Sequence, residues 1–124
     1  MIKLVYIAGK FSGPNAWAIE RNVRAAEDLG AQVAQLRAMP IIPHANTRFF
    51  HGLEGTTAEQ WYEGTLELLR RCDAVLMAEN YLESTGATAE YEEARLLMIP
   101  HFFAPDLSSL AKWLRGWTGY KEVG

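Results

Sequence analysis

Glu90 is the residue whose type and position in this sequence point most directly to chemistry. It lies in a helix expected after the strand-forming run Ala74 to Met77 and the polar turn Glu79 to Gly86. At about 100° per residue, it falls on the apolar side of that helix, whose face comprises Ala87, Tyr91, Ala94 and Met98, with Leu97 at its edge. Two interpretations fit: a rim glutamate whose stem packs while its head reaches water, or a functional carboxylate.

A second polar turn, Gly9-Lys10-Phe11-Ser12-Gly13-Pro14, follows the first apolar run. Two glycines around a lysine and a serine, between a strand and a helix, suit an anion that faces backbone N–H groups and a helix N-terminus. The turn matches neither a Walker loop nor the GxGxxG pattern. An ordinary strand-to-helix connection explains it equally well.

Three other polar residues are candidates for substrate contacts. His44 and Asn46 follow the second expected strand, where they could hydrogen-bond a ligand, although His44 could equally be structural. No second histidine stands at the spacing a metal site would need, so we expect no metal. Thr65 occupies an inward position of its helix, beside Trp61 and Leu69, where it either faces a ligand or bonds to its own helix.

Alternating strands and helices must position these residues. We expect a long helix capped by Asn15 and ending before Pro40, with Gly30 a possible break, and a helix that opens on a capping box at Thr56-Thr57-Ala58-Glu59 and ends near Arg71. Asp73 is expected to bond local backbone, and Asp106 to cap a last helix through Arg115. The expected strands are 3–8, 39–43, 74–77 and 101–104.

This pattern predicts one α/β domain over residues 1–124: a flavodoxin-like (Rossmann-like) three-layer sandwich with a parallel sheet of four to five strands, in the order 2-1-3-4. The order reverses between the first and third strands, and ligands bind at such a crevice beyond the carboxyl ends of the strands. Both polar turns end there, and the helix that carries Glu90 leaves from it. This convergence favours the functional interpretation of Glu90.

Composition narrows the function classes. The net charge is −3, 49% of the 124 residues are hydrophobic, and no basic cluster stands out, so we expect no nucleic-acid partner. No apolar run is long enough to span a membrane, and the N-terminus lacks a signal-peptide pattern, so we expect a cytoplasmic protein with no membrane partner.

The single cysteine, Cys72, is better explained as a small core residue than as a nucleophile. Trp113, Trp117 and Tyr120 suggest packing on the sheet or on another subunit.

Three motifs, in order, resemble the nucleoside 2-deoxyribosyltransferase superfamily. They are Tyr6-Ile-Ala-Gly9, Cys72-Asp-Ala-Val75 and Ser84-Thr-Gly-Ala-Thr-Ala-Glu90, and they look closest to those of the 2′-deoxynucleoside 5′-monophosphate N-glycosidase branch. Each motif is short, and the specificity lies in their order and spacing. The resemblance covers nearly the whole chain.

The resemblance implies roles for individual residues. Glu90 would be the nucleophile that attacks the sugar C1′, and Tyr6 would lie near the sugar and the nucleophile. The phosphate would contact Ser84 and the turn to Gly86, together with the first-loop residues Gly9, Lys10 and Ser12, although the family carries other side chains in that loop. A family aspartate that helps to protonate the leaving base is replaced here by Thr65, and a threonine is a poor general acid. Glu79 and Glu83 are alternative acids.

The expected function is therefore cleavage of the N-glycosidic bond of a (deoxy)nucleoside 5′-monophosphate, without a cofactor, by a nucleotide N-glycosidase or a deoxyribosyltransferase. We expect the protein to be a homo-oligomer, with a dimer as the favoured state. A carboxylate close to C1′ can stabilise oxocarbenium character or form a covalent bond. The main rival is a nucleotide-binding or sensing domain without catalysis, motivated by Thr65. A receiver domain and a dinucleotide dehydrogenase are weaker rivals, since the first wants an aspartate where Glu79 stands and the second wants GxGxxG.

Overall fold

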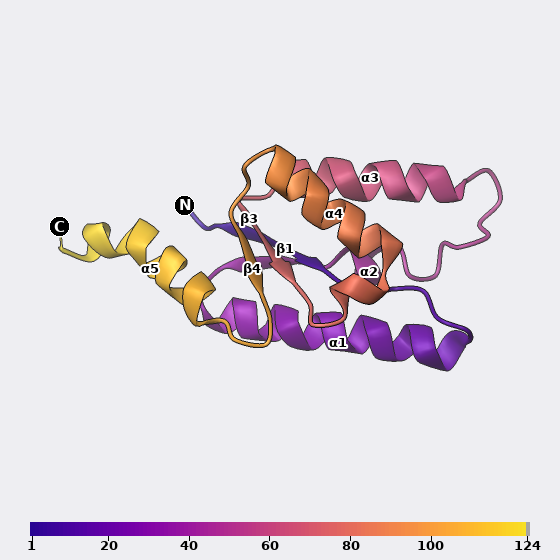
Figure 1. The fold of residues 1–124 in the computed structure, drawn as a ribbon, viewed down its shortest axis with the longest axis horizontal. Helices are drawn as coiled ribbons and strands as arrows, with labels where there is room; N and C mark the ends of the chain where they lie inside the picture. Colours follow the sequence, from indigo (N-terminus) through magenta and orange to yellow (C-terminus); the bar gives the residue numbers. More distant parts are fainter. Residues whose placement is uncertain (124) are drawn as a thin grey trace.

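The computed structural model describes the backbone of residues 1–123 and the side chains of residues 1–116. Strands and helices alternate along the chain, and the helices lie above and below a central sheet (Figure 1). The elements are β1 (Leu4–Ala8), α1 (Ala16–Gln35), β2 (Met39–Ile41), α2 (Pro43–Asn46), α3 (Ala58–Arg70), β3 (Ala74–Met77), the short 3-10 helix η1 (Tyr81–Glu83), α4 (Thr85–Leu96), β4 (His101–Phe103) and α5 (Ser108–Val123).

The sheet has four parallel strands in the order β2-β1-β3-β4, which confirms the predicted α/β fold and strand order. In the pairing of the two central strands, Tyr6 of β1 lies opposite Val75 of β3, and Ala8 lies opposite Met77. Both central strands are almost entirely buried, as expected for a parallel sheet covered on both faces. Their carboxyl ends point towards the same edge of the molecule.

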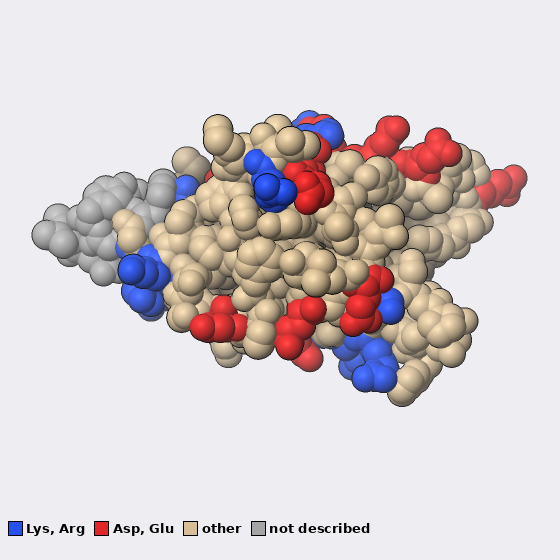
Figure 2. All heavy atoms as spheres, viewed as in Figure 1, with Lys and Arg blue, Asp and Glu red and all other residues tan. Residues whose placement is uncertain are grey.

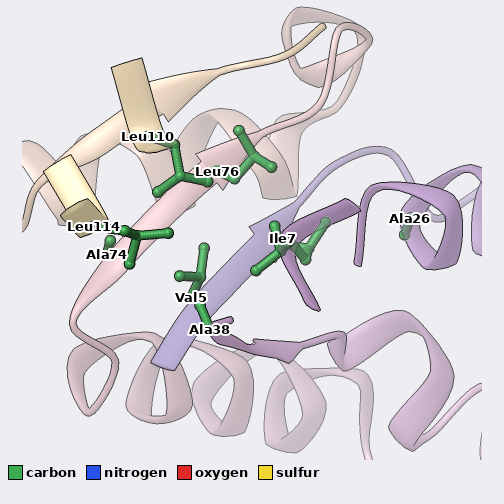
Figure 3. Packing of buried hydrophobic residues seen from close by; sticks show 9 residues of the cluster. Val5, Ile7, Ala26, Ala38, Ala74, Leu76, Leu110 and Leu114 are labelled. Atoms are coloured by element: carbon green, nitrogen blue, oxygen red, sulfur yellow. The ribbon is translucent and has the colours of Figure 1, made fainter. Parts of the chain in front are cut away.

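One face of the sheet packs on α1 and α5. Because side chains alternate along a strand, Val5 and Ile7 of β1 both point to this face. Figure 3 shows them with Leu76 of β3 and with Leu110 and Leu114 of α5. The described side chain of Trp113 also packs here, with its ring 5.8 Å from that of Phe102. These contacts fix α5 to the sheet.

The opposite face packs on α3 and α4, which completes the three layers. Tyr6 and Ala8 of β1 point to this face, together with Val75 and Met77 of β3. They meet Leu69, Cys72, Ala87 and Ala94. Alternation along β1 therefore directs the Tyr6 phenol towards α4, the helix that carries Glu90.

Helix α1 forms as predicted, without a break at Gly30, and ends at Gln35. Asn15 is its N-cap, and the side chain accepts a hydrogen bond from the amide of Ala18 at 2.9 Å. Gly30 is buried, and a β-carbon at this position would lie 2.5 Å from Cδ1 of Ile42. The glycine thus permits close packing of the helix on the chain after β2.

Two helix ends differ from the prediction. The N-cap of α3 is Thr57, not Thr56, since the Thr57 hydroxyl accepts from the amide of Gln60 at 3.0 Å. Helix α4 ends at Leu96, and Met98 beyond it has a φ of 57° and is 87% exposed. The prediction that Met98 belongs to the apolar face was therefore wrong, because the helix ends two residues before it.

The last helix is longer than predicted. The Asp106 carboxylate accepts a hydrogen bond from the amide of Ser108 at 2.9 Å, as expected of a helix start, but α5 continues past Arg115 to Val123. The predicted packing of Trp117 and Tyr120 lies outside the side chains that the structure describes. Among the residues that it describes, no helix is long and apolar enough to cross a bilayer.

Asp73 makes a contact that local reasoning did not predict. Its Oδ2 accepts a hydrogen bond from the amide of Leu4 at 2.8 Å, 69 residues away, and its Oδ1 lies 4.0 Å from Nζ of Lys3. The expectation of a bond to local backbone was wrong because the parallel pairing of β1 and β3 brings the first residue of β1 beside the residue that precedes β3. Asp73 thus anchors the start of the central strand pair.

We expect Asp73→Ala to lower the free energy of unfolding by roughly 1–3 kcal/mol, because it leaves the partly buried amide of Leu4 without its acceptor. Asp73→Asn keeps an acceptor oxygen and should lose less than the alanine variant. Urea unfolding followed by circular dichroism measures both. Equal losses in the two variants would show that the hydrogen bond is not the stabilising contact.

Candidate active site

A cavity of about 270 Å³ opens beyond the carboxyl end of β1, between α3, α4 and the segment around α2. Its volume is near the small end of the range for ligand sites. It gathers most of the residues that the sequence analysis singled out, from four separate parts of the chain. Those that line it are Gly9, Ser12, His44, Thr65, Ser84, Gly86 and Glu90.

Glu90 and Tyr6 form a buried pair at this cavity. Glu90 is 8% exposed and Tyr6 is fully buried, and the Tyr6 hydroxyl donates a hydrogen bond to Oε2 of Glu90. The two residues are 84 positions apart in sequence, on α4 and β1. The carboxyl group does not reach out to bulk water as a rim glutamate would. It is held in the wall of a cavity.

Burial dominates the acid–base properties of this pair. It raises the pKa of Glu90 to about 7, although the hydrogen bond from Tyr6 works in the opposite direction. The pKa of Tyr6 is raised well above its usual value, first by burial and then by the charge and hydrogen bond of Glu90. Tyr6 therefore remains a phenol that donates, and Glu90 changes between acid and carboxylate near neutral pH.

Thr65 lies beside this pair, on α3. Its hydroxyl donates to the carbonyl oxygen of Tyr62 at 2.9 Å, as the structural interpretation expects. The same side chain also interacts with the Tyr6 phenol, and this interaction opposes, without cancelling, the rise in the pKa of Tyr6. The two interpretations of Thr65 therefore hold together: it bonds to its own helix and also lines the cavity next to Glu90.

The two polar turns are in direct contact, as their predicted place at the crevice requires. The amide of Lys10 donates to Oδ1 of Asn80 at 3.2 Å, and Nζ of Lys10 lies 3.5 Å from Oε1 of Glu83. The side-chain amide of Asn22, on α1, also fixes the first turn, because its Nδ2 donates hydrogen bonds to the carbonyl oxygens of Phe11 and Ser12. Sequence analysis did not identify Asn80 or Asn22.

Ser84 and Gly86 begin the helix that carries Glu90. The Ser84 hydroxyl accepts from the amide of Ala87 at 3.1 Å and caps α4. A β-carbon at Gly86 would meet nothing closer than Oγ of Ser84 at 3.8 Å, so packing does not require this glycine. Its bare backbone instead keeps the start of α4 open to the cavity, where helix amides favour an anion.

Gly9 has a steric explanation that the sequence did not reveal. A β-carbon at this position would lie 2.9 Å from Cβ of Ala78, at the end of β3. The close approach of the two strand ends therefore requires glycine here. Since Gly9 also lines the cavity, this packing function and the predicted substrate contact are compatible.

His44 is buried and fixed by backbone. Its Nε2 lies 3.0 Å from the carbonyl oxygen of Gly9 and 3.1 Å from that of Lys10, and both oxygens can only accept. Nε2 therefore carries the proton. Burial lowers the pKa of His44, against the effect of these two bonds, so the ring is neutral near pH 7. In this arrangement His44 supports the first turn.

Two predicted contact residues, Lys10 and Asn46, are not among those that line the cavity. The Lys10 ammonium is paired with Glu83, and Asn46 is exposed at the end of α2. The alternative acids Glu79 and Glu83 do not line it either, and both are exposed. Among the described residues, Glu90 is therefore the carboxylate that reaches this cavity.

Aromatic side chains form one wall of the cavity, and of these sequence analysis named only Trp61 as inward. Phe11, His51, Trp61 and Tyr62 line the cavity, and Phe50 packs on Trp61 with ring centroids 5.8 Å apart. His51 and Phe50 lie in the loop 47–56, and a loop gives no periodicity from which to assign a face. Planar rings that line a cavity suit a flat heterocycle.

The described residues contain no group of three or more histidine, cysteine, aspartate or glutamate side chains placed to hold a metal ion. Cys72 is buried on the α3 side of the sheet, and its thiol donates to the carbonyl of Leu68. Burial raises the pKa of Cys72 to about 11, which leaves it as an unreactive thiol. The reactive groups of the site are thus carboxyl, hydroxyl and imidazole.

Fold and site define the class of this protein as a parallel α/β domain with a buried carboxyl group in a cavity at the carboxyl edge of its sheet. A family model described as "Domain of unknown function (DUF4406)" matches residues 3–103, so the chain belongs to that family. The matched segment runs from the start of the sheet to its last strand. No curated protein matches the chain.

We expect Glu90→Gln to stabilise the protein at alkaline pH. The folded-state pKa of Glu90 lies near 7, above the 4.5 of a free glutamate, so the native state binds more protons and loses stability as pH rises from 4.5 to 7. Above pH 7 the buried charge should cost roughly 2–4 kcal/mol, which glutamine avoids.

Urea unfolding of both proteins at pH 8 and at pH 4.5 measures this cost. The variant should be the more stable at pH 8, and the difference should nearly vanish at pH 4.5. Glu92→Gln, at an exposed position of the same helix, is the control and should show no such pH dependence. A Glu90→Gln protein no more stable than wild type at pH 8 would contradict the elevated pKa.

Proposed function

We propose that this protein cleaves the N-glycosidic bond of a (deoxy)nucleoside 5′-monophosphate, with Glu90 as the nucleophile, and releases the free base. The observation that carries the proposal is the Glu90 carboxyl group, buried in a cavity wall and held by Tyr6. The sequence resemblance to the nucleoside 2-deoxyribosyltransferase superfamily, above all its nucleotide N-glycosidase branch, supports the same assignment. No metal or cofactor takes part in the proposed reaction.

The reaction builds positive charge at C1′ as the base departs. The Glu90 carboxylate would attack C1′ while the C1′–N bond breaks, and water would then release the sugar from the glycosyl ester with retained configuration. Tyr6 would keep one carboxylate oxygen in place, which leaves the other free to attack. Ala87, which lines the cavity, is small enough to leave room for the sugar.

The phosphate would lie at the start of α4. Ser84 and Gly86 line the cavity there, and the helix N-terminus favours negative charge. Gly9 and Ser12 of the first turn line the same cavity. Lys10 belongs to the same turn, and its ammonium, which is paired with Glu83, would add a positive charge near the phosphate. The base would then meet the aromatic wall.

A non-catalytic nucleotide-binding or sensing role is the second candidate. It is favoured by Thr65, which stands where the family resemblance expects an acid, and by the absence of Glu79 and Glu83 from the cavity lining. Such a protein would bind a nucleotide with the same phosphate and aromatic contacts. Incubation with a panel of ribo- and deoxynucleotides, with free base detected by chromatography, separates the two functions, because only the enzyme releases base.

The partner is proposed to be a small-molecule nucleotide. Figure 2 shows lysine and arginine side chains interspersed with acidic ones on the face it displays, and acidic side chains along α3. The exposed glutamates of this helix are Glu59, Glu63 and Glu67. A surface of this kind gives a nucleic-acid backbone no continuous basic track.

We expect Glu90→Gln to abolish base release while nucleotide binding changes little. Glutamine keeps the size and the hydrogen bond with Tyr6 but lacks the nucleophilic charge, and loss of a nucleophile commonly slows an enzyme by about a thousandfold or more. Single-turnover chromatography measures release, and calorimetry measures binding. Glu92→Gln is the control, and a Glu90→Gln protein that turns over at the rate of wild type would disprove the assignment.

We also expect a homodimer in solution. Large apolar side chains are exposed around η1, the end of α4 and β4, and burying them against a second copy would be favourable. They are Leu82, Leu96, Leu97, Met98 and Phe103. Multi-angle light scattering at micromolar concentration should give twice the mass of the chain. A monomer mass would contradict this expectation.

A further inference from the structure

The leaving base needs a proton donor, and the structure offers one on the loop between α2 and α3. His51 lines the same cavity as Glu90, on a different element. An imidazole is the side chain whose charge ordinarily changes near neutral pH, which suits it to donate and recover a proton. The following argument rests on the proposed N-glycosidase function.

A series of ring contacts positions His51. Its ring lies 5.0 Å from that of Phe11, with only 18° between the planes. Phe11 in turn packs against His44, with centroids 5.7 Å apart, and His44 is fixed to the carbonyl oxygens of Gly9 and Lys10. The exposed His51 side chain is therefore tied, through Phe11, to the buried end of β1.

The loop that carries His51 is also fixed by an ion pair to α1 and by a hydrogen bond within the loop itself. Arg48 forms an ion pair with Glu20 of α1, and the amide of Phe50 bonds to the carbonyl of Thr47 at 3.0 Å. Gly52 follows with a φ of 80°, a conformation that glycine adopts without strain. These contacts define the path of the loop at the edge of the cavity, so His51 has a reproducible place there.

The other titratable groups around the cavity are poorly suited to protonate the base. Glu90 is the nucleophile, and Tyr6 is buried and donates to it. His44 carries its proton on the nitrogen bound to backbone carbonyls. Tyr62 of α3 also lines the cavity, but a phenol is a far weaker acid than an imidazolium, so the imidazolium is the better proton donor.

We propose that His51 is the general acid and base of the reaction, in place of the carboxylic acid that Thr65 does not provide. In the first step, the His51 imidazolium gives its proton to a ring nitrogen of the base. The C1′–N bond breaks with its electrons moving to the base, and a Glu90 oxygen bonds to C1′. In the second step, water attacks C1′, its proton passes to the neutral His51, and the bond to Glu90 breaks to restore the carboxylate.

Two substitutions separate proton transfer from stacking. His51→Phe keeps a ring that can stack on Phe11 but cannot carry a proton, and His51→Ala removes both functions. His101→Phe is the matched control, because His101 lies on β4 against Tyr91 and Phe103 and does not line the cavity. Each protein is tested with the nucleotide that wild type cleaves fastest in a purine and pyrimidine panel.

We expect His51→Phe and His51→Ala to slow single-turnover base release about a hundredfold or more. The pH profile of both variants should also differ from that of wild type, because the rate would no longer depend on the protonation state of residue 51. Nucleotide affinity of His51→Phe should stay within about threefold of wild type, since stacking remains.

Two results would overturn the assignment, and they differ from each other. If wild type releases base and His51→Phe does so at the same rate with the same pH profile, His51 is a stacking residue and not the acid. If wild type binds a nucleotide but releases no base from any member of the panel, the proposed function fails and the role of His51 fails with it.

Discussion

The site depends on one hydrogen bond that joins two layers of the fold, from Tyr6 of β1 to Glu90 of α4. It places a carboxyl group where water is largely excluded, and burial raises the pKa of that group to about 7. The bond exists because alternation along β1 turns Tyr6 towards α4, and because Ala87 and Ala94 let that helix pack closely on the sheet. A charge held in this way is costly for folding, and it is the kind of strain that functional sites retain.

The parallel sheet brings the rest of the site to the same place. Parallel strands have their carboxyl ends at the same edge of the sheet, so the turns after β1 and β3 meet there. The hydrogen bond from the Lys10 amide to the Asn80 side chain joins the two turns. Membership of a family of unknown function leaves the chemistry open. The proposal therefore depends on the site itself: a buried carboxyl group, a helix start suited to an anion and an aromatic wall.

Periodic segments could be predicted from the sequence, and irregular ones could not. The inward position of Glu90 follows from helical spacing, the strand order from the rules for crossovers between parallel strands, and the Asn15 cap from the residue type that precedes the helix. Asp73 was misjudged because its partner, the amide of Leu4, is close only after β1 and β3 have paired. His51 was missed for a similar reason, since it lies on a loop and its position depends on a ring 40 residues away.

The stereochemistry of transfer to methanol tests the central claim, that Glu90 forms a covalent bond with C1′, most directly. In water containing methanol, the protein and the nucleotide that it cleaves should yield a methyl glycoside of the sugar phosphate, whose anomeric configuration can be read by NMR. Two displacements, the first by Glu90, predict the same configuration as in the nucleotide. The opposite configuration would mean that the acceptor attacks C1′ directly, and it would contradict Glu90 as the nucleophile.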